Sequence, residues 1–114
     1  MRISVPKETK IHEYRVGLTP DSVGELTALG HEVWVEHLAG AAIGYEDGHY
    51  AAAGACLVDT ASAFDGDLVV KVKEPSLAEC GMLSAGQVLF TYLHLAAAAP
   101  QAAALIERGV TAIA

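Results

Sequence analysis

A long apolar run near the end of the printed sequence is the feature that most constrains the fold. The segment Gly86–Ala96, GQVLFTYLHLA, begins with a turn glycine and continues through β-branched, aromatic and other apolar residues almost without interruption. A strand of this composition is typical of a parallel sheet that is covered on both faces. Because parallel strands need long crossover connections, usually helices, the run predicts strands and helices in alternation.

The start of the chain has the strand–helix–strand pattern that such a sheet requires. A first strand is expected at Arg2–Pro6, and a helix is expected to begin after the N-cap Thr19 and to end at Gly30. The run Glu32–Glu36, EVWVE, predicts the second strand. A unit of this kind forms the right-handed crossover of a parallel sheet.

The remaining segments continue this alternation. Strands are expected at 55–59, 67–73, 88–93 and 110–114, and helical segments at 45–53, at 60–64, after Ser76 and at 100–108. The residues spaced to face the core are Val23, Leu26 and Leu29 in the first helix and Leu77, Cys80 and Leu83 in the one after Ser76. The pattern predicts an α/β fold, namely a doubly wound, mostly parallel, flavodoxin-like sheet of about six strands with helices on both faces.

Charge and composition argue against several classes of partner. The 114 residues carry a net charge of −7, which argues against nucleic acid and anionic membranes, because both bind clustered positive charge. No run approaches the ~18 apolar residues of a membrane span, and the start MRISVPKETK lacks the apolar region of a secretory signal. We therefore expect a cytoplasmic location, where Cys56 and Cys80 are small buried hydrophobes without a disulfide or zinc site.

Three residues that can carry chemistry fall at one predicted edge of the sheet. Arg15 follows the first strand, Lys73 ends the fourth and His94 ends the fifth. In an open α/β sheet, ligands bind outside the carboxyl ends of the strands. Arginine can bind a carboxylate through two parallel hydrogen bonds, lysine supplies a compact positive charge, and histidine exchanges protons near neutral pH. The set predicts a site for a small anionic substrate.

Each of the three has an ordinary structural alternative, and the residues alone leave both interpretations open. Arg15 can form a surface ion pair, Lys73 can mark the strand leaving the core, and His94 can be a hydrogen-bonded core residue. The remaining histidines and the turn at 65–67 lack metal-ligand spacing, so no metal site is predicted. No two of the 11 glycines are two positions apart, so the dinucleotide-binding fingerprint is absent and no cofactor-binding residue is predicted.

Three motifs, in order along the chain, resemble one known family. RISVPKETKIHEYRVGLTP resembles the start of the alanine dehydrogenase and pyridine nucleotide transhydrogenase superfamily. DLVVKVKEP and GQVLFTYLHLA are similar to alanine dehydrogenases in particular. The transhydrogenase α subunit shares the first motif and a related lysine motif but lacks the histidine segment. The resemblance covers essentially the whole chain.

The resemblance implies a role for each candidate residue. Arg15 and Lys73 match positions that bind the carboxylate and carbonyl of the substrate, and His94 matches the catalytic acid/base. The implied reaction is the reversible, NAD-dependent oxidative deamination of L-alanine to pyruvate and ammonia. L-alanine or pyruvate is therefore the small-molecule substrate that the resemblance implies.

The resemblance also implies parts that these residues lack. Family members continue into an NAD-binding Rossmann domain and a C-terminal segment that completes the substrate domain. We therefore expect residues 1–114 to form an incomplete N-terminal catalytic or substrate domain, inactive alone and without a site for NAD. The alternative is a stand-alone, non-enzymatic module that binds a small acid or another subunit. Apolar surface left by the missing parts predicts a homo-oligomer or association with a cofactor-domain chain.

Overall fold

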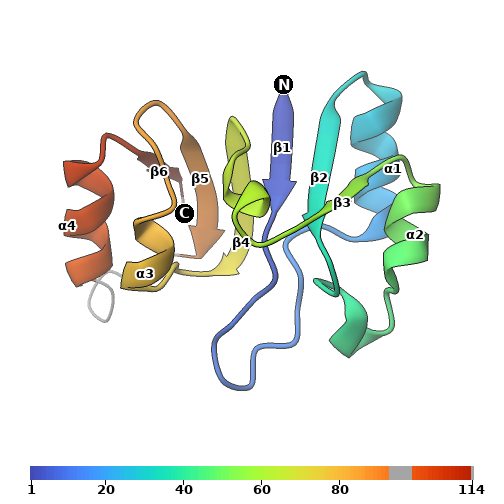
Figure 1. The fold of residues 1–114 in the computed structure, drawn as a ribbon, viewed down its shortest axis with the longest axis horizontal. Helices are drawn as coiled ribbons and strands as arrows, with labels where there is room; N and C mark the ends of the chain where they lie inside the picture. The colour runs from blue at the N-terminus through green and yellow to red at the C-terminus, as the bar shows by residue number, and fades with distance from the viewer. Residues whose placement is uncertain (93–98, 114) are drawn as a thin grey trace.

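A six-stranded sheet forms the middle of the protein in the computed structural model, which describes residues 1–92 and 99–113, with Tyr92 and Ala99 as backbone only. The strands are β1 (Arg2–Val5), β2 (Glu32–Glu36), β3 (Cys56–Val58), β4 (Leu68–Lys73), β5 (Val88–Tyr92) and β6 (Thr111–Ile113). Their order is β3-β2-β1-β4-β5-β6, and all neighbouring strands are parallel. The predicted α/β fold with a parallel sheet is confirmed (Figure 1).

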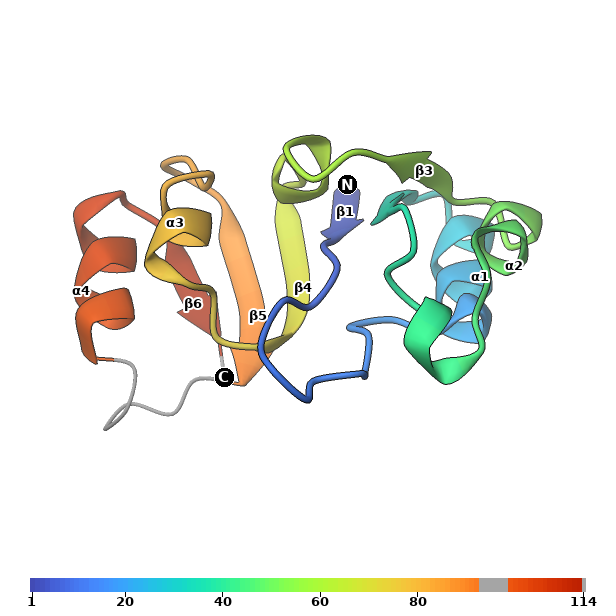
Figure 2. The same ribbon diagram turned by 60° about the horizontal axis from the view of Figure 1, so that its bottom comes forward.

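The helices cover the sheet in two groups. The helical elements are α1 (Pro20–Ala28), η1 (Ala41–Ile43), α2 (Asp47–Ala52), η2 (Ser62–Phe64), α3 (Leu77–Cys80) and α4 (Ala99–Glu107). Figure 2 shows α1 and α2 at the end of the sheet formed by β2 and β3, and α3 and α4 at the end formed by β5 and β6. No helix in the described ranges has the length and apolar character needed to cross a membrane.

Two hydrophobic clusters, one on each face of the sheet, hold these helices in place. Neighbouring residues of a strand point to opposite faces, and β4 shows the result. Val70 belongs to the cluster that contains Val23 of α1 and Tyr50 of α2, whereas Val69 belongs to the cluster that contains Leu83 and the side chains of α3 and α4. A central strand must therefore have apolar residues on both sides, as β4 does at Val69 and Val70.

The predicted helix starts at Thr19 and Ser76 are confirmed by their capping bonds. The Thr19 hydroxyl accepts a hydrogen bond from the backbone N–H of Ser22 at 3.2 Å, with Pro20 in the first turn. The Ser76 hydroxyl accepts from the N–H of Glu79 at 3.1 Å, and Glu79 accepts from the N–H of Ser76 at 2.8 Å, which completes a capping box.

Three side chains that were predicted to be buried are exposed. Leu29 follows the last residue of α1, where the backbone has left the helix, so helical spacing no longer directs its side chain inward. Leu77 opens α3, which is a single turn, too short for a three-position stripe to face one core. Cys56 lies on the edge strand β3, and its neighbour Leu57 is the residue that packs against the core.

Several element boundaries also differ from the prediction. The segment 45–53 was expected to be one helix, but the structure has the short turn η1 before a six-residue α2 that begins only at Asp47. The last strand is three residues long. The expected strand ends Leu93 and Ala114 lie outside the described residues.

The order of the strands reverses between β1 and β4. From β1 the chain proceeds to β2 and β3 in one direction, and from β4 it proceeds to β5 and β6 in the other. In doubly wound sheets, the ligand crevice lies at this reversal, outside the carboxyl ends of the strands. The long segment 6–19 leaves β1 at this edge, and Lys73 ends β4 there (Figure 1).

Candidate functional site

Arg15 and Lys73, two of the predicted site residues, line the same hollow at this edge. The hollow has a volume of about 500 Å³ and is lined by residues 11–15 of the segment after β1 and by Lys73 at the end of β4. The structure therefore brings together the two cations that the sequence placed at one edge. His94, the third predicted residue, lies outside the described residues.

The guanidinium of Arg15 is bound by Glu13 of the same segment. Arg15 Nε donates to Glu13 Oε2 at 2.9 Å, and Nη2 donates to Oε1 at 2.8 Å. The backbone N–H of Arg15 also donates to Oε2, at 2.9 Å. This fork occupies one edge of the guanidinium. The edge formed by Nη1 and Nη2 points away from Glu13, and the Arg15 side chain is 66% exposed.

Glu13 is held in its charged form by this contact. The hydrogen bonds from Arg15 lower the pKa of the Glu13 carboxyl from 4.5 to about 2, and the positive charges of Arg15 and Lys73 act in the same direction. The Glu13 side chain is only 5% exposed. At neutral pH the Glu13 carboxylate is therefore charged, and it holds the guanidinium of Arg15 in place. Glu13 was not among the residues predicted from the sequence, although it lies only two positions before Arg15.

Lys73 is positioned by contacts of its backbone outside the regular sheet ladder. The N–H of Lys73 donates to Glu8 Oε1 at 3.1 Å, and its carbonyl accepts from the Thr91 hydroxyl at 2.9 Å. Side chains from β5 and from the segment after β1 thus hold the end of β4. Neither Glu8 nor Thr91 belongs to a local pattern that would single it out, so both were missed from the sequence.

Gly17 brings the Arg15 segment into contact with β4. A Cβ atom at Gly17 would lie 2.6 Å from the carbonyl oxygen of Val70, a distance that no side chain tolerates. The segment also borders a second hollow of about 370 Å³, which is lined by Glu8, Glu13 and Arg15 and by residues between 38 and 42. Arg15 therefore lines both hollows, and of these two only the first is also lined by Lys73.

The residues at the strand reversal do not fit a dinucleotide. The strand order is the one found in dinucleotide-binding sheets, but such a site needs a glycine-rich turn that leads directly from β1 into a helix N-terminus. In this chain β1 is followed by Pro6, Lys7 and Glu8, and α1 begins only at Pro20. The Glu8 side chain, 2% exposed and paired with Lys71, fills the place that the glycine-rich turn has in such sites. Within the described part of the chain, no group of His, Cys, Asp and Glu side chains could hold a metal ion.

Comparisons with known proteins agree with the motifs. The family model described as "Alanine dehydrogenase/PNT, N-terminal domain" matches residues 4–114. The alanine dehydrogenases of Halomonas elongata and Mycobacterium tuberculosis are 51% and 50% identical to this chain over its whole length, which is 31% of each relative. The alanine dehydrogenase of Bacillus subtilis is 50% identical, and the chain covers 30% of it.

Solved structures show the same relationship. An L-alanine dehydrogenase matches the whole chain with a TM-score of 0.97 and 49% identity, and the chain covers 32% of it. A transhydrogenase from Sinorhizobium meliloti matches with a TM-score of 0.95 and 30% identity, and the chain covers 34% of it. The chain thus spans about a third of the length of the relatives that it matches.

Proposed function

Because this chain belongs to the alanine dehydrogenase/PNT N-terminal domain family, we propose that it is the substrate-binding domain of an L-alanine dehydrogenase. The observation that carries the proposal is the hollow shared by Arg15 and Lys73, with Arg15 fixed by a buried carboxylate. The proposed reaction is the reversible, NAD-dependent oxidative deamination of L-alanine to pyruvate and ammonia. Its substrates are small anions or zwitterions, which suit two adjacent cations.

Each residue has a separate task in this proposal. Arg15 binds the substrate carboxylate through its Nη1–Nη2 edge, because Glu13 occupies the other edge. Lys73 places its ammonium group at the carbonyl oxygen of pyruvate, where it stabilises negative charge. His94 is the proposed acid/base.

NAD, the hydride acceptor that the family implies, is assigned to residues outside this chain, since the strand reversal does not fit it. The chain alone is therefore expected to bind pyruvate without reducing or oxidising it. Formation of NADH from L-alanine and NAD by the purified chain would contradict this part of the proposal.

Isothermal titration of the chain with pyruvate tests the binding site. We expect saturable binding that weakens roughly tenfold to a hundredfold in Arg15→Ala and in Lys73→Ala, since each variant loses a charge-assisted hydrogen bond. Lys10→Ala is the matched control, because Lys10 lies on the same segment but pairs with Glu74 at 3.0 Å and does not line the hollow. Absence of binding, or equal binding by all variants, would reject the proposal.

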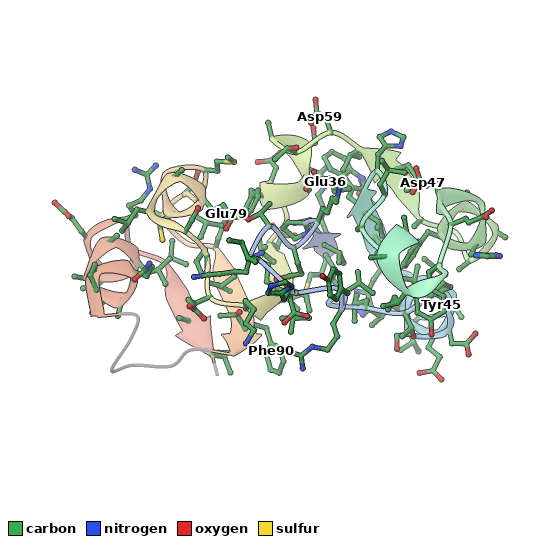
Figure 3. The ribbon with its side chains drawn as sticks, turned by 90° about the horizontal axis from the view of Figure 1, so that it is seen from below. Glu36, Tyr45, Asp47, Asp59, Glu79 and Phe90 are labelled. Carbon is green, nitrogen blue, oxygen red and sulfur yellow. The ribbon has the colours of Figure 1, made fainter. Side chains whose placement is uncertain are left out.

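A second proposal concerns self-association through the face of β5 and β6 opposite α3. Leu89 packs into the cluster formed with α3 and α4, so Phe90, labelled in Figure 3, points to the other face. The Phe90 side chain is half exposed. Ile113 on the edge strand β6 is also exposed. Apolar side chains beside an open strand edge favour contact with a second copy of this chain.

Light scattering tests this self-association. It should show an oligomer, and Phe90→Ser should weaken that oligomer. A monomeric mass at all concentrations would exclude self-association.

A further inference from the structure

The Glu8 carboxylate lies between the segment after β1 and the end of β4, and we propose that Glu8 is a positioning residue for Lys73. Its Oε2 atom accepts from the N–H of Val72 at 3.0 Å, and its Oε1 atom accepts from the N–H of Lys73 at 3.1 Å. The inference rests on the proposed function, because it concerns the same anion site. Glu8 itself touches no substrate and acts through the backbone of Lys73.

These two N–H groups need a side-chain acceptor because β1 ends before β4 does. The pairing between the strands runs from Ile3 with Leu68 to Ser4 with Val69, so the last residues of β4 extend beyond β1. A backbone N–H away from water must find a partner. Glu8 supplies that partner where the neighbouring strand has stopped.

A bulge in β4 explains why one carboxylate can reach two consecutive N–H groups. Against β5, Val70 pairs with Phe90 but Lys73 pairs with Tyr92, so β4 contains one extra residue. In a regular strand, successive residues alternate in direction, whereas a bulge bends the strand and changes the direction of the residues beyond it. The extra residue turns the end of β4 toward Glu8.

The same bulge separates the two lysines of β4. Residues two positions apart on a regular strand face the same side, yet Lys71 is 2% exposed and donates to Glu8 Oε1 at 3.2 Å, whereas Lys73 lines the hollow. Lys71 Nζ also lies 3.7 Å from Oε2 of Glu79, a residue of α3 that Figure 3 labels. The buried lysine balances the charge of Glu8, so the ammonium of Lys73 can serve a ligand.

The test neutralises Glu8 without leaving Lys71 buried and unpaired. In Glu8→Gln/Lys71→Met the side-chain amide keeps one acceptor oxygen, so one of the two N–H bonds to β4 is lost. We expect pyruvate affinity to fall about tenfold, and to fall no further when Lys73→Ala is already present, since a residue that acts through Lys73 is not additive with its removal. Equal losses in the two backgrounds would overturn the proposal.

Glu79→Gln is the matched control. It makes the same chemical change near the same lysine, keeps the acceptor for the Ser76 N–H, and touches neither Val72 nor Lys73. Its pyruvate affinity should equal that of the unchanged chain. A tenfold loss in this control would show that charge near Lys71, and not the hold on β4, sets the affinity.

Hydrogen exchange separates this inference from the proposed function. In Glu8→Gln/Lys71→Met the N–H groups of Val72 and Lys73 should exchange faster, while the N–H of Val69 in the middle of β4 keeps its protection. Unchanged exchange at Val72 and Lys73 would overturn the inference even if pyruvate binds. If the unchanged chain binds no pyruvate, the proposed function fails, and the exchange result alone decides whether Glu8 positions Lys73.

Discussion

A buried carboxylate, that of Glu13, binds the exposed guanidinium of Arg15 through two parallel hydrogen bonds of 2.9 and 2.8 Å. Arg15 therefore forms an ion pair, which was its structural alternative. The contact also supports the functional interpretation, because it fixes one edge of the guanidinium and directs the other outward. An ion pair and a binding residue are thus compatible at this position.

Glu13→Gln should weaken pyruvate binding about threefold to tenfold, because a neutral amide accepts a weaker hydrogen bond and Arg15 becomes more mobile. Isothermal titration measures the change. Glu25→Gln on the exposed surface of α1 is the control with the same chemical change and should bind pyruvate normally. Equal affinities for both variants would show that Arg15 needs no internal partner.

The Glu13 carboxyl should titrate at about pH 2 in the folded chain, and Arg15→Ala should move its pKa back toward 4.5. Since the folded pKa is below the unfolded value, the charged form stabilises the fold above pH 4.5, and this contribution is lost as the pH falls from 4.5 through 2. Carbon NMR of the side-chain carboxyl follows the titration, with circular dichroism to define the range in which the chain stays folded. A midpoint near pH 4.5 in the unchanged chain would contradict the paired hydrogen bonds between Arg15 and Glu13.

Gly17→Ala should lower the free energy of unfolding by about 1–3 kcal/mol, because the new Cβ overlaps the Val70 carbonyl and the segment must move. Pyruvate binding should weaken as well, since this movement displaces Arg15 from Lys73. Gly48→Ala in α2 is the control, because a Cβ there meets nothing within 4 Å. Urea unfolding measures both variants, and equal stability of the two would argue against the close approach.

Tyr50→Phe should lower the free energy of unfolding by about 1 kcal/mol, because the Tyr50 hydroxyl donates to the carbonyl of Leu18 at 2.8 Å. Urea unfolding tests this, with Tyr45→Phe as the control at the ring that packs edge-on against Tyr50. A smaller loss for Tyr50→Phe than for Tyr45→Phe would contradict the assigned bond.

Burial also raises the pKa of Tyr50 from 10.0 to about 12. The folded state therefore keeps this proton longer than the unfolded state, and the stability it contributes is present below pH 10 and lost as the pH rises through 12. Ultraviolet absorbance of tyrosinate should show one late-titrating residue that disappears in Tyr50→Phe. Unchanged titration in that variant would assign the late step to another tyrosine.

Local sequence patterns determined the class of fold and part of the site. Apolar runs, the capping residues Thr19 and Ser76, and the positions of Arg15 and Lys73 after predicted strands are properties of neighbouring residues, which periodicity and capping chemistry reveal. Because parallel strands share one carboxyl edge, these patterns were sufficient to place the two cations together.

Tertiary structure alone decided the order of the strands, the exposure of Leu29 and Leu77, and the hold of Glu8 on Lys73. Glu8 and Lys73 are 65 positions apart, so their contact depends on how β1 and β4 lie in the sheet. The bulge that separates Lys71 from Lys73 is visible only in the pairing of β4 with β5, whereas the alternating sequence KVK by itself places both lysines on one face. Local periodicity specifies which elements form, whereas contacts between distant elements specify which charged side chain is buried and which faces the hollow.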